Sequence, residues 1–305
     1  MSKKILIIGG TYFLGRVFSI LAYREGYELT FINRGRFSMK NLGEHIHEFV
    51  CDRHDTVRLQ TLELDTDYDA LVDFCAYAPS DIQTLCDALP CHFTQYIYLS
   101  TADVYERAPG IKKEDAPQQT IQPLNEVGLY TYRKMLLEKE LQKVHEQNHF
   151  AYTILRPAFV FGPYNYAPRE SWFIQNVIQN HSVYYPSDST GHFQMIYVKD
   201  AAEAIIRCIQ SEKSHNEAYN LSAPEVLTYR TFLDELHNAS DVDFTEQNVT
   251  VARSLTARIP FPFPLTEAES ELFDGSKLTD ELSLTYTPFS EALAATYRSM
   301  KGIYL

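Results

Sequence analysis

The sequence has no long hydrophobic run, no closely paired cysteines and no excess of positive charge. Its first apolar run covers residues 5–8, which is too short for the core of a secretory signal, and no later segment approaches the length of a membrane span. The five cysteines are odd in number and form no C-x-x-C pair, which favours reduced thiols in a reducing compartment. We therefore expect a cytoplasmic protein with no membrane association.

Acidic residues outnumber basic ones, 40 against 27, and the formal net charge is −13. A surface of this sign repels phosphate backbones and anionic lipid heads, so bulk charge argues against nucleic acid as a partner. With 305 residues and 45% hydrophobic content, the chain can bury a sizeable core in one large domain or in a main domain with a smaller one. A small-molecule substrate is the expected partner.

Strand-like and helix-like segments alternate over roughly the first half of the chain. Expected strands cover residues 5–8, 29–33, 48–51, 70–75, 96–100 and 152–156, and expected helices cover residues 14–25, 82–89 and 130–146. This alternation predicts a parallel sheet with helices on both faces, which is an α/β fold of the Rossmann-type, doubly wound class.

The pattern loosens after Pro157. Further strands are expected at residues 194–198 and 218–221, on either side of a helix at 201–209. From residue 228 onward the sequence predicts helices and proline-rich turns. An extended connector is expected at Pro260, Pro262 and Pro264.

The segment from Lys4 to Gly15 is the most informative, because a buried strand runs into a glycine-bearing turn and then a helix. Such a turn directs backbone N–H groups and the positive end of the helix towards a nucleotide pyrophosphate. In the pattern G-x-x-G-x-x-G, Gly9 allows the tight turn and Gly15 the close packing of helix on strand, but Tyr12 holds the middle position. The Tyr12 side chain must point away from the pyrophosphate or cover it. A strand followed by a loop of small residues is the alternative interpretation. The cofactor-binding residues expected here are Gly9, Thr11, Tyr12, Phe13, Leu14 and Gly15.

This segment sets the expected division of the chain. We predict an NAD(P)-binding Rossmann domain over residues 1–163, to which residues 192–227 return. A smaller substrate-binding lobe is expected over residues 164–191 and 228–305. The lobe would close a cleft over the ends of the strands, where open α/β sheets hold their ligands.

The end of the second expected strand bears on the choice of cofactor. An acidic residue about twenty positions past the glycine loop selects NAD by bonding the ribose hydroxyls, whereas an arginine accommodates the extra phosphate of NADP. Here the neutral Asn33 precedes Arg34 and Arg36, whose guanidinium groups suit a phosphate. The sequence favours NADP over NAD, with solvent-exposed arginines in a turn as the alternative.

Tyr130 and Lys134 are spaced four residues apart, so on a helix their side chains share one face within about 6 Å. An ammonium beside a phenol lowers the pKa of the phenol towards neutrality and makes it a general acid and base. Tyr297 and Lys301 repeat the spacing, but only Tyr130 follows an apolar strand. Thr101, at the carboxyl end of that strand, is placed to hydrogen-bond the same substrate oxygen.

Several motifs in order make the chain resemble the extended short-chain dehydrogenase/reductases, the NAD(P)-dependent epimerase/dehydratase family. By this resemblance Tyr130 is the catalytic acid and base, Lys134 holds the nicotinamide ribose, Thr101 orients the reacting oxygen and Asp52 bonds the adenine amino group. The family likeness also implies a homodimer. The matching segments are residues 9–15, 99–105, 130–134 (Y-x-x-x-K), 155–163 (L-R-P to G-P), 197–202 and 219–221.

The chain departs from the family at two places. Ala102 and Asp103 stand where sugar-nucleotide dehydratases carry an acid pair, so a 4,6-dehydratase is not expected. Residues 192–194, His-Phe-Gln, replace an arginine that neutralises a diphosphate, which counts against a sugar-diphosphate substrate. In its G-G-T-x-F-L-G start and in Gln194, the chain resembles an atypical branch of the family more than the nucleotide-sugar enzymes. That branch includes chloroplast stem-loop RNA-binding proteins.

Two functions therefore stay open. The first is an NAD(P)-dependent oxidoreductase or epimerase acting on a hydroxyl or carbonyl carbon of a sugar-like or other small substrate. The second is a non-catalytic nucleotide-sensing or RNA-binding protein of the atypical branch. No metal is expected, because the spacing of the only imidazole and thiolate cluster does not fit a zinc site. That cluster comprises His45, His47, Cys51 and His54.

Overall fold

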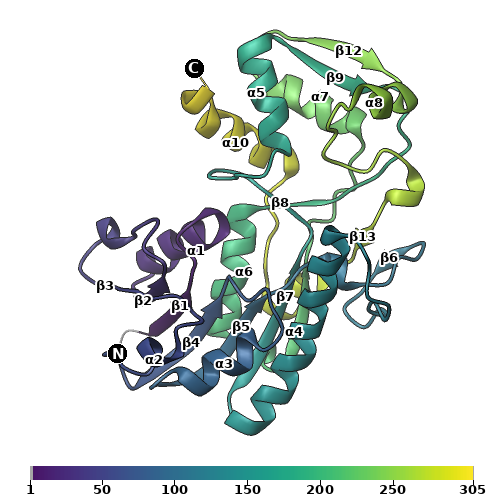
Figure 1. Cartoon of the computed structure of the whole chain (residues 1–305). Helices are drawn as coiled ribbons and strands as arrows, with labels where there is room; N and C mark the ends of the chain where they lie inside the picture. Colours follow the sequence, from purple (N-terminus) through teal and green to yellow (C-terminus); the bar gives the residue numbers. More distant parts are fainter. Residues whose placement is uncertain (1–2, 305) are drawn as a thin grey trace.

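The computed structural model describes residues 3–304, and within them one parallel sheet of seven strands forms the centre of the molecule (Figure 1). The strand order is β11-β7-β5-β4-β1-β2-β3, and neighbouring strands all run in the same direction. This confirms the predicted Rossmann-type α/β class. The strands are β1 (Lys4–Ile8), β2 (Glu28–Asn33), β3 (Ile46–Val50), β4 (Asp67–Asp73), β5 (His92–Leu99), β7 (Ala151–Pro157) and β11 (Glu217–Leu221).

The alternating side chains of β1 explain why helices cover both faces of the sheet. Ile5 and Ile7 pack in one buried cluster with α1 (Phe13–Arg24) and α6 (Val198–Gln210). Leu6 and Ile8 pack in the opposite cluster with α3 (Asp81–Ala88) and α4 (Glu126–Asn148). Successive residues of a strand point to opposite faces, so a strand that is apolar at every position requires cover on both sides. Only the strand ends then remain open to a ligand.

A second group of elements lies beyond one end of the sheet (Figure 1). Its core is aromatic, and Phe173, Phe193, Phe232 and Phe263 are all buried in it. The helices and strands of this lobe are α5 (Glu170–Asn180), β9 (Ser182–Pro186), α7 (Tyr229–Ala239), β12 (Thr245–Val249), α8 (Val251–Ala257) and α10 (Phe289–Tyr304).

Short elements join the sheet to the lobe. Two parallel pairs do so: β8 (Phe159–Phe161) with β10 (Met195–Tyr197), and β6 (Ile111–Lys112) with β13 (Leu272–Phe273). The remaining elements are η1 (Lys40–Leu42), α2 (Thr56–Leu59), η2 (Ala102–Val104), η3 (Glu212–Ser214), η4 (Glu267–Glu269) and α9 (Ser276–Leu282). Among residues 3–304, no helix is both long and apolar enough to pass through a lipid bilayer.

The structure corrects two details of the sequence prediction. Helix α4 begins at Glu126, not at Tyr130, because the Asn125 side chain accepts a hydrogen bond from the Gly128 N–H and caps the helix one turn earlier. The region after residue 228 was expected to hold helices and turns, yet β12 pairs there in parallel with β9. The strand β12 is polar and largely exposed, so it has no apolar alternation to predict it.

Candidate active site

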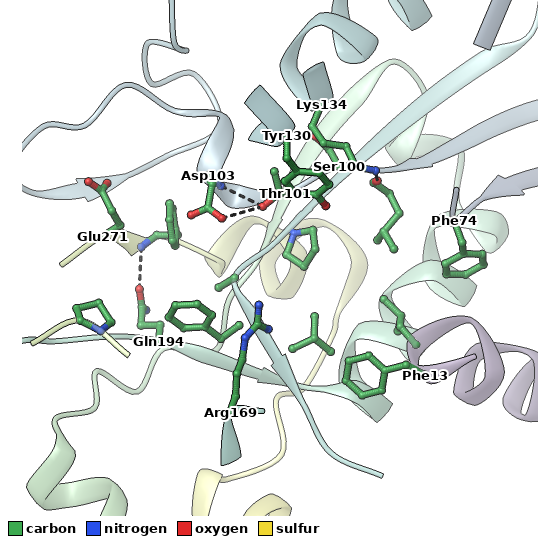
Figure 2. A pocket seen from close by; sticks show the side chains of 18 of the residues that line it. Phe13, Phe74, Ser100, Thr101, Asp103, Tyr130, Lys134, Arg169, Gln194 and Glu271 are labelled. Carbon is green, nitrogen blue, oxygen red and sulfur yellow. Dashed lines mark hydrogen bonds between the residues drawn. The ribbon is translucent and has the colours of Figure 1, made fainter. Parts of the chain in front are cut away.

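A pocket of about 530 Å³ opens at the carboxyl ends of the central strands. Its walls come from the start of α1, the segment after β4, the end of β5, helix α4, the end of β7 and several lobe segments (Figure 2). Thr101, Tyr130 and Lys134 all line it. Parallel strands end at the same edge, so residues far apart in the sequence meet there.

The glycine loop lies beside this pocket and leaves no room for extra side chains. Gly9 and Gly10 have φ angles of 78° and 66°, which favour glycine. A Cβ on Gly10 would lie 2.4 Å from the Ile7 side chain, and one on Gly15 would lie 2.4 Å from the Gly10 Cα. A side chain at Gly15 would therefore push helix α1 away from the loop, and one at Gly10 would clash with Ile7 of β1. Such a bare loop before a helix fits a pyrophosphate that approaches the backbone closely.

Tyr12 does not extend freely into solvent from this loop. Its ring stacks on Phe37 at a centroid distance of 5.1 Å and on Tyr166 at 5.2 Å. Phe37 follows β2 and Tyr166 belongs to the lobe, so the three rings link the glycine loop to both. Phe13 and Leu14, the next two residues, line the pocket, and Thr11 is a half-buried residue of the loop.

The ends of β2 and β3 hold the residues expected near the adenosine. The Asn33 Oδ1 accepts a hydrogen bond from the Gly35 N–H at 2.6 Å, while its buried Nδ2 has no partner among the described residues. Arg34 is exposed beside it. Asp52 is half-exposed and accepts a hydrogen bond from the His54 N–H at 3.0 Å, which holds the pKa of the carboxyl below its usual range. A buried donor without a partner fits a ligand rich in hydroxyls, as the ribose of a dinucleotide is.

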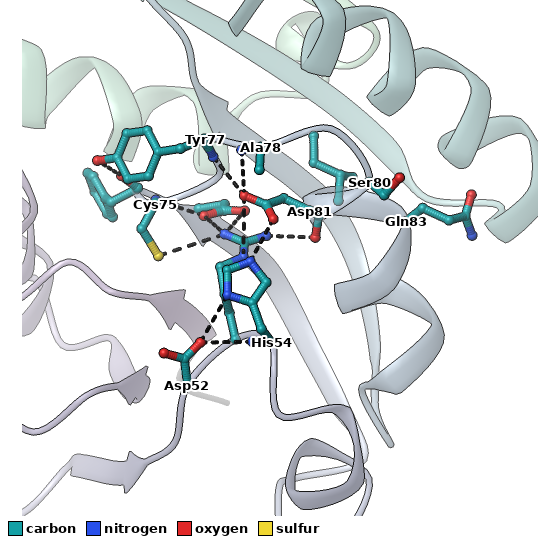
Figure 3. A network of polar contacts seen from close by, with 12 residues as sticks. Asp52, His54, Cys75, Tyr77, Ala78, Ser80, Asp81 and Gln83 are labelled. Atoms are coloured by element: carbon teal, nitrogen blue, oxygen red, sulfur yellow. Dashed lines mark hydrogen bonds and ion pairs between the residues drawn. The ribbon is translucent and has the colours of Figure 1, made fainter. Parts of the chain in front are cut away.

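Sequence reasoning missed a buried ion-pair network beneath these residues (Figure 3). Arg53 Nη1 contacts both Asp73 carboxylate oxygens at 2.9 and 3.0 Å, and its Nη2 donates to the Asp81 carbonyl at 2.7 Å. The His54 ring bridges the Asp52 and Asp81 carboxylates at 3.1 and 2.8 Å. The network ties the segment after β3 to the end of β4 and the start of α3. Its partners lie far apart in sequence, so no local pattern could reveal it.

Thr101 lies two residues beyond the end of β5 and faces the pocket beside Asp103 (Figure 2). Its hydroxyl donates to Asp103 Oδ2 at 3.2 Å and accepts from the Asp103 N–H at 3.3 Å. Burial against the pocket wall raises the pKa of Asp103, and the Thr101 hydroxyl opposes this rise. The turn after β5 therefore presents a hydroxyl and a carboxyl side by side.

Lys134 and Tyr130 lie on the same face of α4, and the Lys134 Nζ is 5.9 Å from the centroid of the Tyr130 ring. The ammonium donates to the Leu99 carbonyl at 2.8 Å and lies between the rings of Tyr77 and Tyr98. Burial lowers the pKa of Lys134 to about 8. The residue itself is 2% exposed, whereas Tyr130 is 41% exposed at the pocket.

The expected lowering of the Tyr130 pKa is not found in this structure. Burial of the phenol, with the nearby Tyr166 and Asp103, raises its pKa to about 12, and Arg169 acts in the opposite direction. The physical reason is that protein atoms around the hydroxyl disfavour the charged form, while the lysine ammonium is directed to the Leu99 carbonyl. At neutral pH the Tyr130 phenol is therefore protonated.

Residues 5–222 match the family model described as the NAD dependent epimerase/dehydratase family. The chain belongs to this family. The matched region contains the glycine loop, Thr101, Tyr130 and Lys134. Among residues 3–304, no three histidine, cysteine, aspartate or glutamate side chains are grouped so that they could hold a metal ion.

One curated relative is the chloroplast stem-loop binding protein of 41 kDa b from Arabidopsis thaliana, which is 29% identical over 241 residues. The alignment covers 74% of this family member and 60% of the relative, so the chain spans about three fifths of the relative's length. The name of this relative agrees with the atypical branch of the family that the glycine loop and Gln194 indicate in the sequence.

Solved structures of epimerases share the fold over nearly the whole chain. The UDP-N-acetylglucosamine 4-epimerase from Methanobrevibacter ruminantium is 22% identical with a TM-score of 0.77, and 99% of each chain is covered. The UDP-glucuronic acid 4-epimerase from Bacillus cereus is 19% identical with a TM-score of 0.75, covering 99% of this chain and 100% of its own. A putative epimerase from Burkholderia cenocepacia is 17% identical with a TM-score of 0.80 and 99% coverage of both.

Proposed function

We propose that this family member is a nicotinamide-dependent epimerase or oxidoreductase that acts on a hydroxyl or carbonyl carbon of a sugar-like small molecule. The observation that supports it most is the meeting of Thr101, Tyr130 and Lys134 in one pocket beside the glycine loop. The bound cofactor would supply hydride transfer, and the protein supplies position and proton transfer. The division into a cofactor domain and a substrate lobe, at the boundaries given above, is part of this proposal.

Each of the three residues has a distinct task in this proposal. The Tyr130 hydroxyl gives its proton to a substrate oxygen when a carbonyl is reduced, and takes it back when an alcohol is oxidised. The Thr101 hydroxyl orients that oxygen by a hydrogen bond. Lys134 uses one N–H on the Leu99 carbonyl, which leaves two N–H groups for ribose hydroxyls.

The raised pKa of Tyr130 gives the two directions opposite pH dependence. The protonated phenol dominates at neutral pH, so Tyr130 is ready to donate a proton. Abstraction of a proton needs the phenolate, so oxidation of an alcohol should become faster as the pH rises towards the pKa of Tyr130. Reduction of a carbonyl should become slower over the same pH range, because less of the protonated phenol remains.

Replacement of Tyr130 by phenylalanine tests the role directly. With the cofactor saturating and UDP-glucose, UDP-glucuronic acid and UDP-N-acetylglucosamine as trial substrates, Tyr130→Phe should lower turnover about 10²- to 10⁴-fold. NADH and NADPH affinities, followed by nicotinamide fluorescence, should stay within about twofold. Tyr132→Phe is the matched control, since Tyr132 is on the same helix but outside the pocket. Full turnover by Tyr130→Phe would contradict the assignment.

The same fluorescence titration tests the choice of cofactor. If the Arg34 guanidinium binds the extra phosphate, Arg34→Gln should weaken the binding of NADPH and leave the affinity for NADH unchanged. This role of Arg34 is a prediction from the sequence. A homodimer is likewise proposed from the family likeness alone.

A second candidate function is RNA binding by a non-catalytic member of the family. The name of the Arabidopsis relative supports it, and so does an alternation of arginine and aromatic rings beside the glycine loop. Arg36 lies over the Phe37 ring at 5.5 Å, and Arg16 lies over the Tyr164 ring at 5.2 Å. Bases can stack on such rings while arginines contact phosphates. A salt titration with a labelled RNA hairpin decides it, because phosphate contacts weaken steeply with added salt.

A further inference from the structure

Gln194 is one of the three residues that stand in place of the arginine of nucleotide-sugar enzymes, and its side chain is bonded within the fold. The Gln194 side chain is buried, where its Nε2 donates to the Ala223 carbonyl at 3.0 Å and its Oε1 accepts from the Phe273 N–H at 2.7 Å. Both ends of the amide are therefore engaged in the fold, and the neutral Gln194 side chain brings no positive charge to a substrate anion.

Two arginines from other segments line the same pocket, and the positive charges of both lower the pKa of Asp103. Arg107 lies in the loop between η2 and β6, and Arg169 immediately precedes α5 in the lobe. The Arg169 guanidinium lies over the Phe159 ring at 4.9 Å, and Figure 2 shows it directed into the pocket from the side opposite Thr101 and Tyr130. Neither guanidinium has an ion pair or a hydrogen bond with another residue in the described part of the chain.

The carboxylates of the pocket are already engaged. Glu271 pairs with the buried Lys112, and Glu269 accepts hydrogen bonds from the N–H groups of Leu265 and Thr266. Asp103, which lies close enough to both arginines to feel their charge, is hydrogen-bonded by Thr101. Glu170, next to Arg169 in sequence, is fully buried and accepts from the Gly162 N–H and the Asn165 amide. Among the charged residues that line the pocket, Arg107 and Arg169 are therefore the ones whose N–H donors have no ion pair or hydrogen bond within the described residues.

We propose that Arg107 and Arg169 bind an anionic group of the substrate, a phosphoryl or carboxylate group, across the pocket from Tyr130. They would replace the missing family arginine from different positions in the chain. Planar guanidinium groups match such anions with paired N–H donors, which fixes orientation as well as affinity. This inference rests on the proposed function and narrows its substrate to an anionic sugar or sugar derivative.

Binding of small probes tests the inference without any need for turnover. Glucose 1-phosphate, glucuronate, UDP and neutral glucose are titrated calorimetrically into the full-length protein, with and without NADH. Glucose 1-phosphate, glucuronate or UDP should bind, and glucose should bind at least about tenfold more weakly. Arg169→Gln and Arg107→Gln should each weaken binding of the anion by about 10- to 100-fold. Arg253→Gln, an exposed lobe arginine outside the pocket, is the matched control and should change nothing.

The outcomes separate this inference from the proposed function. Tighter binding of glucose 1-phosphate or UDP identifies a phosphoryl group, and tighter binding of glucuronate identifies a carboxylate. Any one of three results would overturn the inference. Glucose could bind as tightly as the anions, both arginine variants could keep the anion affinity of the unsubstituted protein, or no anion could bind at millimolar concentration. The NADH affinity of both variants, measured by fluorescence, should match that of the unsubstituted protein. A protein that binds anions through these arginines but binds no nicotinamide dinucleotide would instead refute the proposed function.

Discussion

The two sides of the pocket are built by different physical means. On the sheet side, the buried charges each have hydrogen-bonding partners: Lys134, which lines the pocket, and the pair of Glu138 and Arg156, which is joined to the pocket-lining Ser100. The core of the lobe side is apolar, with phenylalanine rings in contact with one another among aliphatic side chains. A buried charge needs a particular partner, whereas apolar rings need only to fill space. The difference indicates that substitutions should cost more stability in the charge network of the sheet side than in the apolar core of the lobe.

The largest expected effect comes from breaking the charge network of the sheet side. Arg156 donates to Glu138 from Nε at 3.0 Å and from Nη2 at 2.7 Å, and to the Tyr105 hydroxyl at 2.8 Å. Arg156→Met leaves the buried Glu138 carboxylate without its counter-charge and should lower the free energy of unfolding by about 3–5 kcal/mol. Urea denaturation followed by circular dichroism measures this change.

A half-exposed ion pair provides the control for that experiment. Arg207 and Glu203 form a half-exposed pair on α6 at 3.0 Å. Arg207→Met should cost less than about 1 kcal/mol, since water screens the pair. Similar losses in the two variants would remove the distinction between the sheet side and an ordinary surface.

A smaller effect is expected at Lys134, and it depends on pH. Burial lowers the pKa of Lys134 to about 8 in the folded protein, below the ordinary value of 10.5, so the folded state binds fewer protons than the unfolded state between these values. The free energy of unfolding, taken relative to that of Lys134→Met, should therefore be lowest below pH 8. It should rise by about 1–3 kcal/mol as the pH increases to about 10. Thermal unfolding of both proteins from pH 6 to 10 measures the difference. Parallel stability curves would show that Lys134 titrates normally.

The smallest effect is expected in the lobe. Phe263 is buried, with its ring centroid 4.1 Å from that of Phe193 and 5.4 Å from that of Phe232. Phe263→Leu keeps an apolar side chain of similar size and should cost about 1 kcal/mol in urea denaturation. Phe263→Ala leaves a cavity and serves as the positive control. A loss above about 3 kcal/mol for the leucine variant would show that the lobe also needs particular shapes.

Local signals explain what could be predicted from the sequence. Gly9 and Gly15 revealed the glycine loop because the backbone there excludes other residues, and the apolar run before it revealed a strand covered on both faces. The spacing of Tyr130 and Lys134 placed both on one helix face because a helix has 3.6 residues per turn. The strand β12 was not predicted, since its pairing with β9 depends on residues about sixty positions away.

Long-range contacts decided what the sequence left open. The sequence suggested that Lys134 would lower the pKa of Tyr130, but the fold directs the ammonium to the Leu99 carbonyl and surrounds the phenol with protein atoms. Arg169 carried no motif at all, yet the lobe places it in the pocket.

The order and spacing of residues by themselves determined the fold class, the glycine loop and the common face of Tyr130 and Lys134, because these follow from periodicity and backbone sterics within a few residues. Only the tertiary structure decided which charges are paired, which remain free and how the pKa of each is shifted. Those properties depend on burial and on distances between segments that meet only after the chain has folded.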